Sequence, residues 1–148
     1  MDWPRRLFFY GTLTHEHDNA LTRLILPRLG TWARRGWVRG TLRLIPDPDG
    51  VYPVLVPGAG RVWGWAYGEC RPVPRAMLAA LDDWEQYDPQ RPRRGEYRRA
   101  AVIVHTRGGP VRAQAYLPNR RAHPGLAPVP GGDFAAHAAA RKLGVLTG

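Results

Sequence analysis

Glycine and proline recur along the whole chain, and their spread limits more than any other feature what it can fold into. The sequence has 17 glycines and 15 prolines among 148 residues. Both residue types interrupt regular secondary structure, so turns must be frequent and a bundle of long helices is disfavoured. The chain is 44% hydrophobic and includes six Trp and six Tyr, which is enough for one aromatic-rich core. These features predict one α+β domain.

Apolar runs and turn signals predict five to seven strands and about three helices. The strands are expected at residues 7–10, 31–45, 51–56, 61–69, 97–106 and 111–117. Turns are expected at 47–50, 57–60 and 108–110, and helices at about 14–29, 72–84 and 133–143. No internal repeat or long linker divides residues 1–148, so we expect a single domain with a Pro- and Gly-rich extension and a helix after about residue 119.

Three features favour a cytoplasmic protein. Cys70 is the only cysteine, so an internal disulfide is excluded and a reducing compartment fits best. No apolar stretch reaches the roughly 18 residues of a membrane-spanning helix. The apolar run at residues 7–10, after the charged N-terminus, is too short for a secretory signal.

The formal net charge of +10 leaves two kinds of partner open. A basic protein can bind nucleic acid or an acidic protein, and a basic surface can also attract small anionic substrates. The densest basic group is Arg91, Arg93, Arg94, Arg98 and Arg99. It is interpreted as a solvated loop and strand start, as a clamp for a substrate carboxylate, or as a phosphate-binding patch.

The expected helix at 72–84 places one carboxylate near its apolar face. We take Leu81 as the centre of the apolar stripe, flanked by Leu78 and Trp84. If the helix runs one turn past Leu81, Glu85 lies only about 40° from the centre, at about 100° per residue. A carboxylate in apolar surroundings has a raised pKa and suits a general base. Two alternatives remain, a frayed helix end with Glu85 in solvent and a buried pair between Glu85 and an arginine.

Asp82 and Asp83 point away from that stripe and are expected to face solvent. Upstream, Tyr10 and Gly11 end an apolar strand in a glycine turn. Such a turn can direct backbone N–H groups at a carboxylate or a carbonyl oxygen, although a tight turn with no ligand is the simpler alternative.

Metal, nucleotide and covalent chemistry find no support in the sequence. His15 and His17 are two residues apart, face different directions on a helix, and have no third histidine nearby. There is no Gly-x-Ser-x-Gly elbow and no Walker or Rossmann glycine pattern. No metal site and no cofactor are therefore expected.

Five short motifs follow one another in order. They are YGTL at residues 10–13, VYPVLVPG at 51–58, VWGWAY at 62–67, LDDWEQY at 81–87 and EYRR at 96–99, followed by the segment 113–119. Together they resemble the gamma-glutamylcyclotransferase-like family, which includes gamma-glutamylamine cyclotransferase and avirulence-induced-gene-like proteins. Gln86 stands where that family usually has glycine.

The resemblance implies a small mixed β-barrel of five to seven strands flanked by about three helices. It implies an enzyme, independent of cofactors, that cyclises a γ-glutamyl amine or peptide to 5-oxoproline and releases the amine. Glu85 would be the general acid and base. The expected substrate-binding residues are Tyr10, Gly11, Thr12, Leu13, Tyr97 and Tyr116. Tyr116 shares its strand face with Arg112 and Gln114, while the opposite face looks more core-like.

Overall fold

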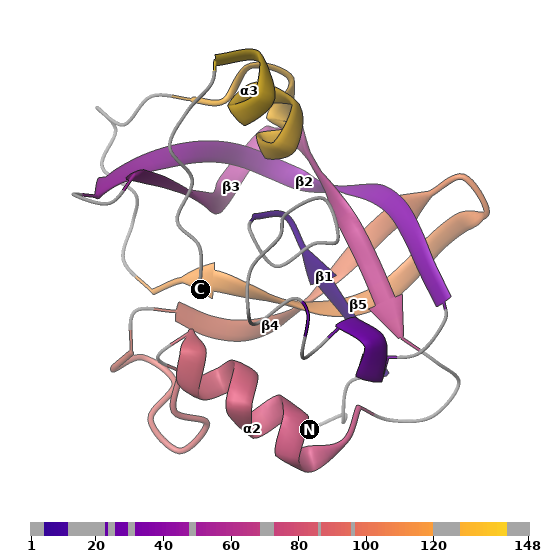
Figure 1. Cartoon of the computed structure of the whole chain (residues 1–148), viewed down its shortest axis with the longest axis vertical. Helices are drawn as coiled ribbons and strands as arrows, with labels where there is room; N and C mark the ends of the chain where they lie inside the picture. Colours follow the sequence, from indigo (N-terminus) through magenta and orange to yellow (C-terminus); the bar gives the residue numbers. More distant parts are fainter. Residues whose placement is uncertain are drawn as a thin grey trace.

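Five strands close into a small barrel with a helix on either side (Figure 1). The computed structural model describes residues 5–11, 23, 26–29, 32–47, 50–68, 73–85, 87–95, 97–119 and 128–141. The strands are β1 (Arg6–Phe9), β2 (Trp32–Asp47), β3 (Gly50–Gly68), β4 (Tyr97–Thr106) and β5 (Gly109–Pro118). The helices are α2 (Arg75–Trp84) and α3 (Phe134–Arg141), with short 3-10 turns η1 (Leu26–Leu29) and η2 (Pro130–Gly132). The predicted α+β barrel is confirmed.

The barrel is mixed because its closing pair is parallel. The strand order is β1-β3-β2-β4-β5, and all neighbours are antiparallel except β1 and β5, which meet at Leu7 and Gln114. Predicted strands 7–10, 97–106 and 111–117 agree with β1, β4 and β5. The β1–β5 pair therefore brings the chain just before Gly11 beside the middle of β5.

Alternation along the strands separates two hydrophobic clusters. The inner cluster consists of Phe8, Val38, Leu42, Leu55, Val62, Ala66, Val104, Ala113, Ala115, Val129 and Phe134. The outer cluster consists of Leu7, Phe9, Leu29, Val54, Tyr67, Val73, Met77, Leu78, Leu81, Tyr87, Tyr97 and Tyr116. The first draws on all five strands and fills the barrel, whereas the second lies between the barrel wall and α2. The wall beneath α2 is consequently buried on both faces.

Residues 57–60 form a bulge where the sequence predicted a turn. Strand β3 runs on through them, and they have no register partners while Arg39 pairs with Arg61 and Thr41 pairs with Val56. Four residues of β3 thus lie opposite Gly40 alone. The turn prediction was wrong because Pro57 and the nearby glycines accommodate a strand irregularity as readily as a chain reversal.

Helix α2 confirms the predicted helix but turns a different face to the barrel. Met77, Leu78 and Leu81 are buried as expected, whereas Trp84 is 45% exposed and Asp82 is only 6% exposed. The true buried stripe follows Leu78, Leu81 and Asp82, which have the i, i+3, i+4 spacing of one helix face. The predictions that Trp84 is buried and that Asp82 faces solvent were both wrong.

The C-terminal part of the described chain folds back on β2 and β3. Pro128 bridges to Arg43, and Asp133 bridges to Trp63. Asp133 Oδ1 accepts a hydrogen bond from the Ala136 N–H, which caps α3 near the start of the helix predicted at 133–143. Most of the predicted helix at 14–29 lies outside the described residues, and residues 26–29 form a 3-10 turn. In the described part of the chain, no helix is long and apolar enough to cross a membrane.

Candidate functional site

Helix α2 ends at the residue expected to carry the chemistry. The Glu85 N–H donates to the Leu81 carbonyl at 2.9 Å, so the helical hydrogen bonding runs one full turn past Leu81. Glu85 is the C-cap, with φ of −84° and ψ of 4°, and its side chain is half-buried. An inward-facing Glu85 requires this extra turn, and the helix has it.

Glu85 and Tyr10 lie close enough to interact electrostatically. Burial raises the pKa of Tyr10 well above its usual range, a backbone hydrogen bond from Leu55 opposes that shift, and the charge of Glu85 adds to it. The Tyr10 hydroxyl donates to the Tyr116 carbonyl oxygen at 2.7 Å. Because a phenol has one proton, Tyr10 has no donor left for a ligand and ties β1 to β5 instead.

The glycine turn after Tyr10 is only partly described. Gly11 lies against Pro53 of β3, and a Cβ on Gly11 would stand 3.1 Å from the Pro53 ring. Thr12, Leu13 and Gln86 lie outside the described residues, as do Cys70, His15 and His17. In the described part, Tyr10 and Gly11 reach the same region of the barrel wall as Glu85.

A buried ion pair links α2 to β4 beside Glu85. Arg99 Nε lies 3.1 Å from Asp82 Oδ1, Arg99 Nη2 lies 3.3 Å from Asp82 Oδ2, and the side chains are 6% and 9% exposed respectively. The bidentate geometry matches the planar guanidinium to the carboxylate. Arg99 is therefore not part of a solvated strand start, as one reading of the arginine cluster held.

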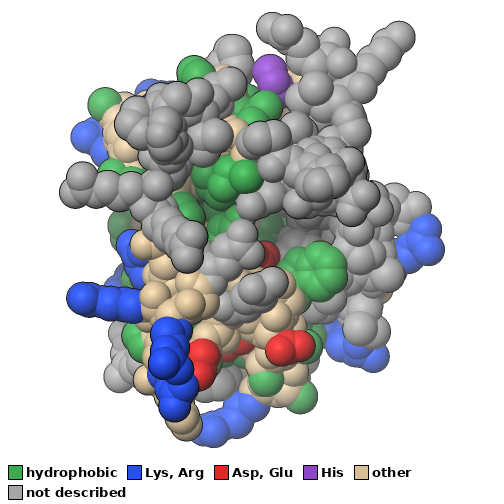
Figure 2. Space-filling model, turned by 90° about the vertical axis from the view of Figure 1, so that its left-hand side faces the viewer, with side chains coloured by type: hydrophobic (Ala, Val, Ile, Leu, Met, Phe, Trp, Pro, Cys, Tyr) green, Lys and Arg blue, Asp and Glu red, His purple; other side chains and the backbone are tan. Residues whose placement is uncertain are grey.

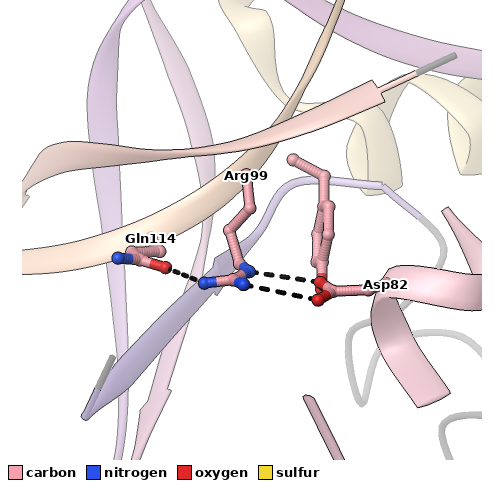
Figure 3. A network of polar contacts seen from close by, with 4 residues as sticks. Asp82, Arg99 and Gln114 are labelled. Carbon is pink, nitrogen blue, oxygen red and sulfur yellow. Dashed lines mark hydrogen bonds and ion pairs between the residues drawn. The ribbon is translucent and has the colours of Figure 1, made fainter. Parts of the chain in front are cut away.

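Arg99 is held from a second side by β5, as Figure 3 shows. Its Nη1 donates to Gln114 Oε1 at 2.5 Å, so the guanidinium lies between α2 and β5. The guanidinium carbon of Arg99 (Cζ) also lies 5.5 Å from the centre of the Tyr87 ring. One buried cation thus connects the helix with two neighbouring strands.

Tyr116 completes this network. Its hydroxyl donates to Asp82 Oδ1 at 2.6 Å, and the side chain is 4% exposed. Burial raises the pKa of Tyr116 far above its usual range, the hydrogen bond to Asp82 and its charge add to the shift, Arg99 opposes it, and Glu85 adds to it. The sequence favoured the opposite face of β5 as the more core-like one. The face of β5 that carries Tyr116 is buried too, because α2 covers it.

The structure thus brings Tyr10, Glu85 and Tyr116 into one region, with Gly11 directly after Tyr10 in the chain, and Tyr97 belongs to the outer cluster together with Tyr116. Sequence reasoning did not assign Asp82, Arg99 and Gln114 to one network. The i, i+3 spacing of Asp82 and Glu85 was a usable signal, because both can share one helix face. No pattern within β4 or β5 marked Arg99 or Gln114 as partners of Asp82.

The loop after α2 is basic and anchored at one point. Arg91, Arg93 and Arg94 are exposed. The Asn119 amide donates to the carbonyl oxygens of Pro92 and Gly95, both at 2.8 Å, which joins the loop to the end of β5. Figure 2 shows this side of the molecule, where basic side chains gather below a hollow. Hydrophobic side chains lie deep in the hollow, and an acidic side chain lies next to these hydrophobic ones. Among the described residues, no group of three His, Cys, Asp or Glu could hold a metal ion.

Known structures share this fold. YkqA from Bacillus subtilis superimposes with a TM-score of 0.66 at 20% identity over 94% of this chain, which spans 42% of YkqA. An AIG2-like protein from mouse has a TM-score of 0.56 at 26% identity, covering 83% of this chain and 82% of that one. A structure described as a gamma-glutamyl cyclotransferase has a TM-score of 0.50 at 20% identity, covering 84% of this chain and 71% of that one.

No curated protein sequence matches the chain significantly. The family profile described as "Gamma-glutamyl cyclotransferase, AIG2-like" matches residues 7–136, which extend from the first strand into α3. The match includes every residue of the site described above. This chain therefore belongs to the AIG2-like gamma-glutamyl cyclotransferase family.

Proposed function

We propose that the protein cyclises a γ-glutamyl amine or a γ-glutamyl peptide to 5-oxoproline, with Glu85 as acid and base. The observation that supports the proposal most is the position of the Glu85 carboxylate. It is half-buried at the end of α2, and its charge acts on both the Tyr10 and the Tyr116 hydroxyl groups. A half-buried carboxylate beside Tyr10 and Tyr116 is suited to proton transfer to and from a bound amine.

The reaction is an intramolecular acyl transfer and suits a site with one acid–base group. Glu85 takes a proton from the substrate's α-ammonium group, and the freed nitrogen attacks the δ-carbonyl carbon. A ring C–N bond forms, and Glu85 passes its proton to the leaving nitrogen as the amide C–N bond breaks. Glu85 then carries the second proton from the ring nitrogen to the released amine. Overall, two protons move from the α-nitrogen to the released amine. Because nucleophile and electrophile belong to one molecule, the effective molarity is high.

Substrate positioning is assigned to the glycine turn. Backbone N–H groups at Gly11, Thr12 and Leu13 would hold the carboxylate of the glutamyl group. Gly11 fits this role because a side chain there would press on the Pro53 ring, so a glycine lets the turn lie close to β3. Tyr97 and Tyr116 would line the site, while Tyr10 holds β1 against β5 through its hydroxyl.

The decisive experiment compares wild type and Glu85→Gln on a panel of γ-glutamyl amines and peptides. We expect wild type to release 5-oxoproline with at least one substrate. Glu85→Gln should lower kcat by at least about 10²-fold, the usual contribution of a positioned acid–base group, with an unchanged circular dichroism spectrum. Undiminished release from the variant would exclude the role of Glu85.

A second candidate function is carried by a row of aromatic and basic side chains on the outer barrel wall. Trp63, Trp37 and His105 are consecutive partners across β3, β2 and β4, and Trp37 stacks on His105 at 4.2 Å. Arg35 lies 4.5 Å from the Trp63 ring centre, and Arg61 lies 4.4 Å from that of Trp37. Arginine planes and aromatic rings in this arrangement are suited to stacking with the bases of single-stranded nucleic acid.

A binding titration separates the two functions. If this row binds nucleic acid, a labelled single-stranded RNA should bind with an affinity that falls steeply with salt, and Trp37→Ala should weaken binding at every salt concentration. Trp84→Ala, at an exposed tryptophan of α2 outside this row, is the matched control and should change binding little. Binding of an acidic peptide in preference to RNA would assign the row to a protein partner instead.

A further inference from the structure

The hydroxyl group of Tyr116 has only one direction in which to donate. Its proton goes to Asp82 Oδ1 at 2.6 Å. Asp82 faces the Arg99 guanidinium through both oxygens, and a carboxylate paired in this way only accepts hydrogen bonds. What Tyr116 can offer to a ligand is therefore the lone pair of its oxygen.

We propose that Tyr116 is a hydrogen-bond acceptor for the α-ammonium group of the substrate, and that Asp82 and Arg99 are positioning residues that keep it one. The inference rests on the proposed function and adds a recognition rule to it. Tyr116 then selects for a free α-amine, which is the nucleophile of the cyclisation.

The chemistry of a γ-glutamyl compound leaves few other matches for this oxygen. The α-carboxylate and the δ-carbonyl of the substrate are acceptors and gain nothing from a second acceptor. The α-ammonium is the only cationic donor, with three N–H groups. A phenol that donates to a charged carboxylate is also a stronger acceptor, because hydrogen bonds in a chain polarise one another.

Glu85 lies about one helical turn after Asp82, on the same face of α2. Its charge reaches the Tyr116 hydroxyl, so two acceptors lie in one region. Together they would hold a cationic nitrogen from two sides. When Glu85 has taken a proton, Tyr116 still holds the nitrogen by an N–H and leaves its new lone pair to face the δ-carbonyl carbon.

The network that fixes this polarity is itself held rigidly. Gln114 accepts from Arg99 Nη1 at 2.5 Å on the side away from Asp82. The Tyr87 ring meets the Tyr116 ring edge-on, with centroids 6.5 Å apart and an angle of 72°. Arg99 cannot turn away from Asp82 without losing Gln114, so the hydroxyl proton of Tyr116 has one stable acceptor.

The test measures a preference between two ligands. One is a γ-glutamyl anilide, and the other is the glutaryl anilide, which lacks only the α-amine. Dissociation constants are measured by calorimetry in the Glu85→Gln background, where turnover is suppressed. Adding Tyr116→Phe should reduce the preference for the α-amino ligand roughly tenfold, the value of one hydrogen bond to a charged group. The glutaryl anilide should bind almost as before.

Two further variants separate positioning from folding. Asp82→Asn should reduce the same preference although Tyr116 is intact, because an amide N–H can donate to the tyrosine oxygen and reverse its polarity. Tyr87→Phe removes a hydroxyl from the neighbouring ring and should leave the preference unchanged. A merely structural role would weaken the binding of both ligands alike. The ratio of their two dissociation constants therefore tests the proposal, whereas one dissociation constant alone does not. If Asp82→Asn fails to fold, Tyr116→Phe decides alone.

The outcomes distinguish this inference from the proposed function. If wild type releases 5-oxoproline and Tyr116→Phe keeps the full preference, the acceptor role is overturned and the cyclase activity stands. If wild type releases no 5-oxoproline and neither anilide binds, both are overturned. A tenfold loss of preference in Tyr116→Phe and Asp82→Asn, but not in Tyr87→Phe, supports the inference.

Discussion

At the scale of single residues, the Asp82–Arg99 pair makes the strongest demand on the fold. Both side chains are almost fully buried, and removing one partner leaves the other charged without compensation. We expect Asp82→Ala to lower the free energy of unfolding by about 3–5 kcal/mol, measured by urea denaturation. The neighbouring Asp83→Ala is the control, because Asp83 is exposed and should change stability by less than about 0.5 kcal/mol. Equal effects of the two would contradict the buried pair.

The buried tyrosines give stability a definite dependence on alkaline pH. The pKa of Tyr10 is raised in the folded state, so the folded protein keeps a proton that the unfolded chain loses above about pH 10. The contribution of Tyr10 is fully present below that pH and is lost as pH rises further, by up to about 1.4 kcal/mol per pH unit.

Tyr10→Phe tests this linkage directly. The variant should be less stable than wild type at pH 8, because it lacks the hydrogen bond to the Tyr116 carbonyl. The difference in melting temperature between the two proteins should then narrow between pH 10 and pH 11.5. A difference that stays constant over this range would show that Tyr10 ionises in the folded protein as it does in water.

Some of the candidate site residues could be predicted from the sequence, and others could not. Glu85 was recognisable because it lies one helical turn past Leu81 in a single amphipathic segment, and the helix extends that far. Asp82 was misassigned because the stripe was centred with Trp84 inside it, although Trp84 is 45% exposed. Its partners Arg99 and Gln114 come from two other strands, at sequence distances of 17 and 32 residues from Asp82, and only the pairing of β4 with β5 brings them together.

At the scale of elements, local signals sufficed for strands bounded by tight turns. The hairpin of β4 and β5 follows from two apolar runs around Gly108 and Gly109. The continuity of β3 did not follow, because Pro57 and Gly58 have the same local preferences in a bulge and in a turn. Which of the two forms is decided by the pairing of β3 with β2 on both sides of the bulge.

The contact between β1 and β3 depends on a glycine with no room for a side chain. A Cβ on Gly64 would stand 2.3 Å from the Phe9 carbonyl oxygen and 2.8 Å from the Phe8 ring. Gly64→Ala should therefore destabilise the protein by about 1–3 kcal/mol through overpacking, in thermal or urea unfolding. Gly108→Ala, in the β4–β5 turn, is the control, since only the Thr106 hydroxyl comes near, at 3.9 Å. If both variants have the same melting temperature, β1 does not lie against Gly64 as described.

At the scale of the whole molecule, the barrel wall separates most of the structural core from α2 and Tyr116, while Tyr10 packs against the inner cluster. The inner cluster stabilises the barrel and includes Phe134 of α3, whereas the outer cluster includes Tyr116 and holds α2, which ends at Glu85. In Figure 1 the two helices lie on opposite sides of the strands. Loosening one side should consequently affect function differently from loosening the other.

Two large-to-small substitutions of similar burial test this separation. Leu81 of α2 is 0% exposed and Phe134 of α3 is 1% exposed. Each change to alanine should cost about 2–5 kcal/mol of stability because it leaves a cavity. Leu81 directly precedes Asp82 and accepts the Glu85 N–H hydrogen bond, so Leu81→Ala should also misplace Glu85 and lower kcat/KM for 5-oxoproline release at least about tenfold per folded molecule, since small displacements of a catalytic group are costly. Phe134→Ala, corrected for its folded fraction by urea titration, should keep kcat/KM within about threefold, because its cavity opens on the far side of the wall. Equal losses of activity in the two variants would mean that the barrel transmits packing defects through its wall, and that the site is not held by α2 and the outer cluster alone.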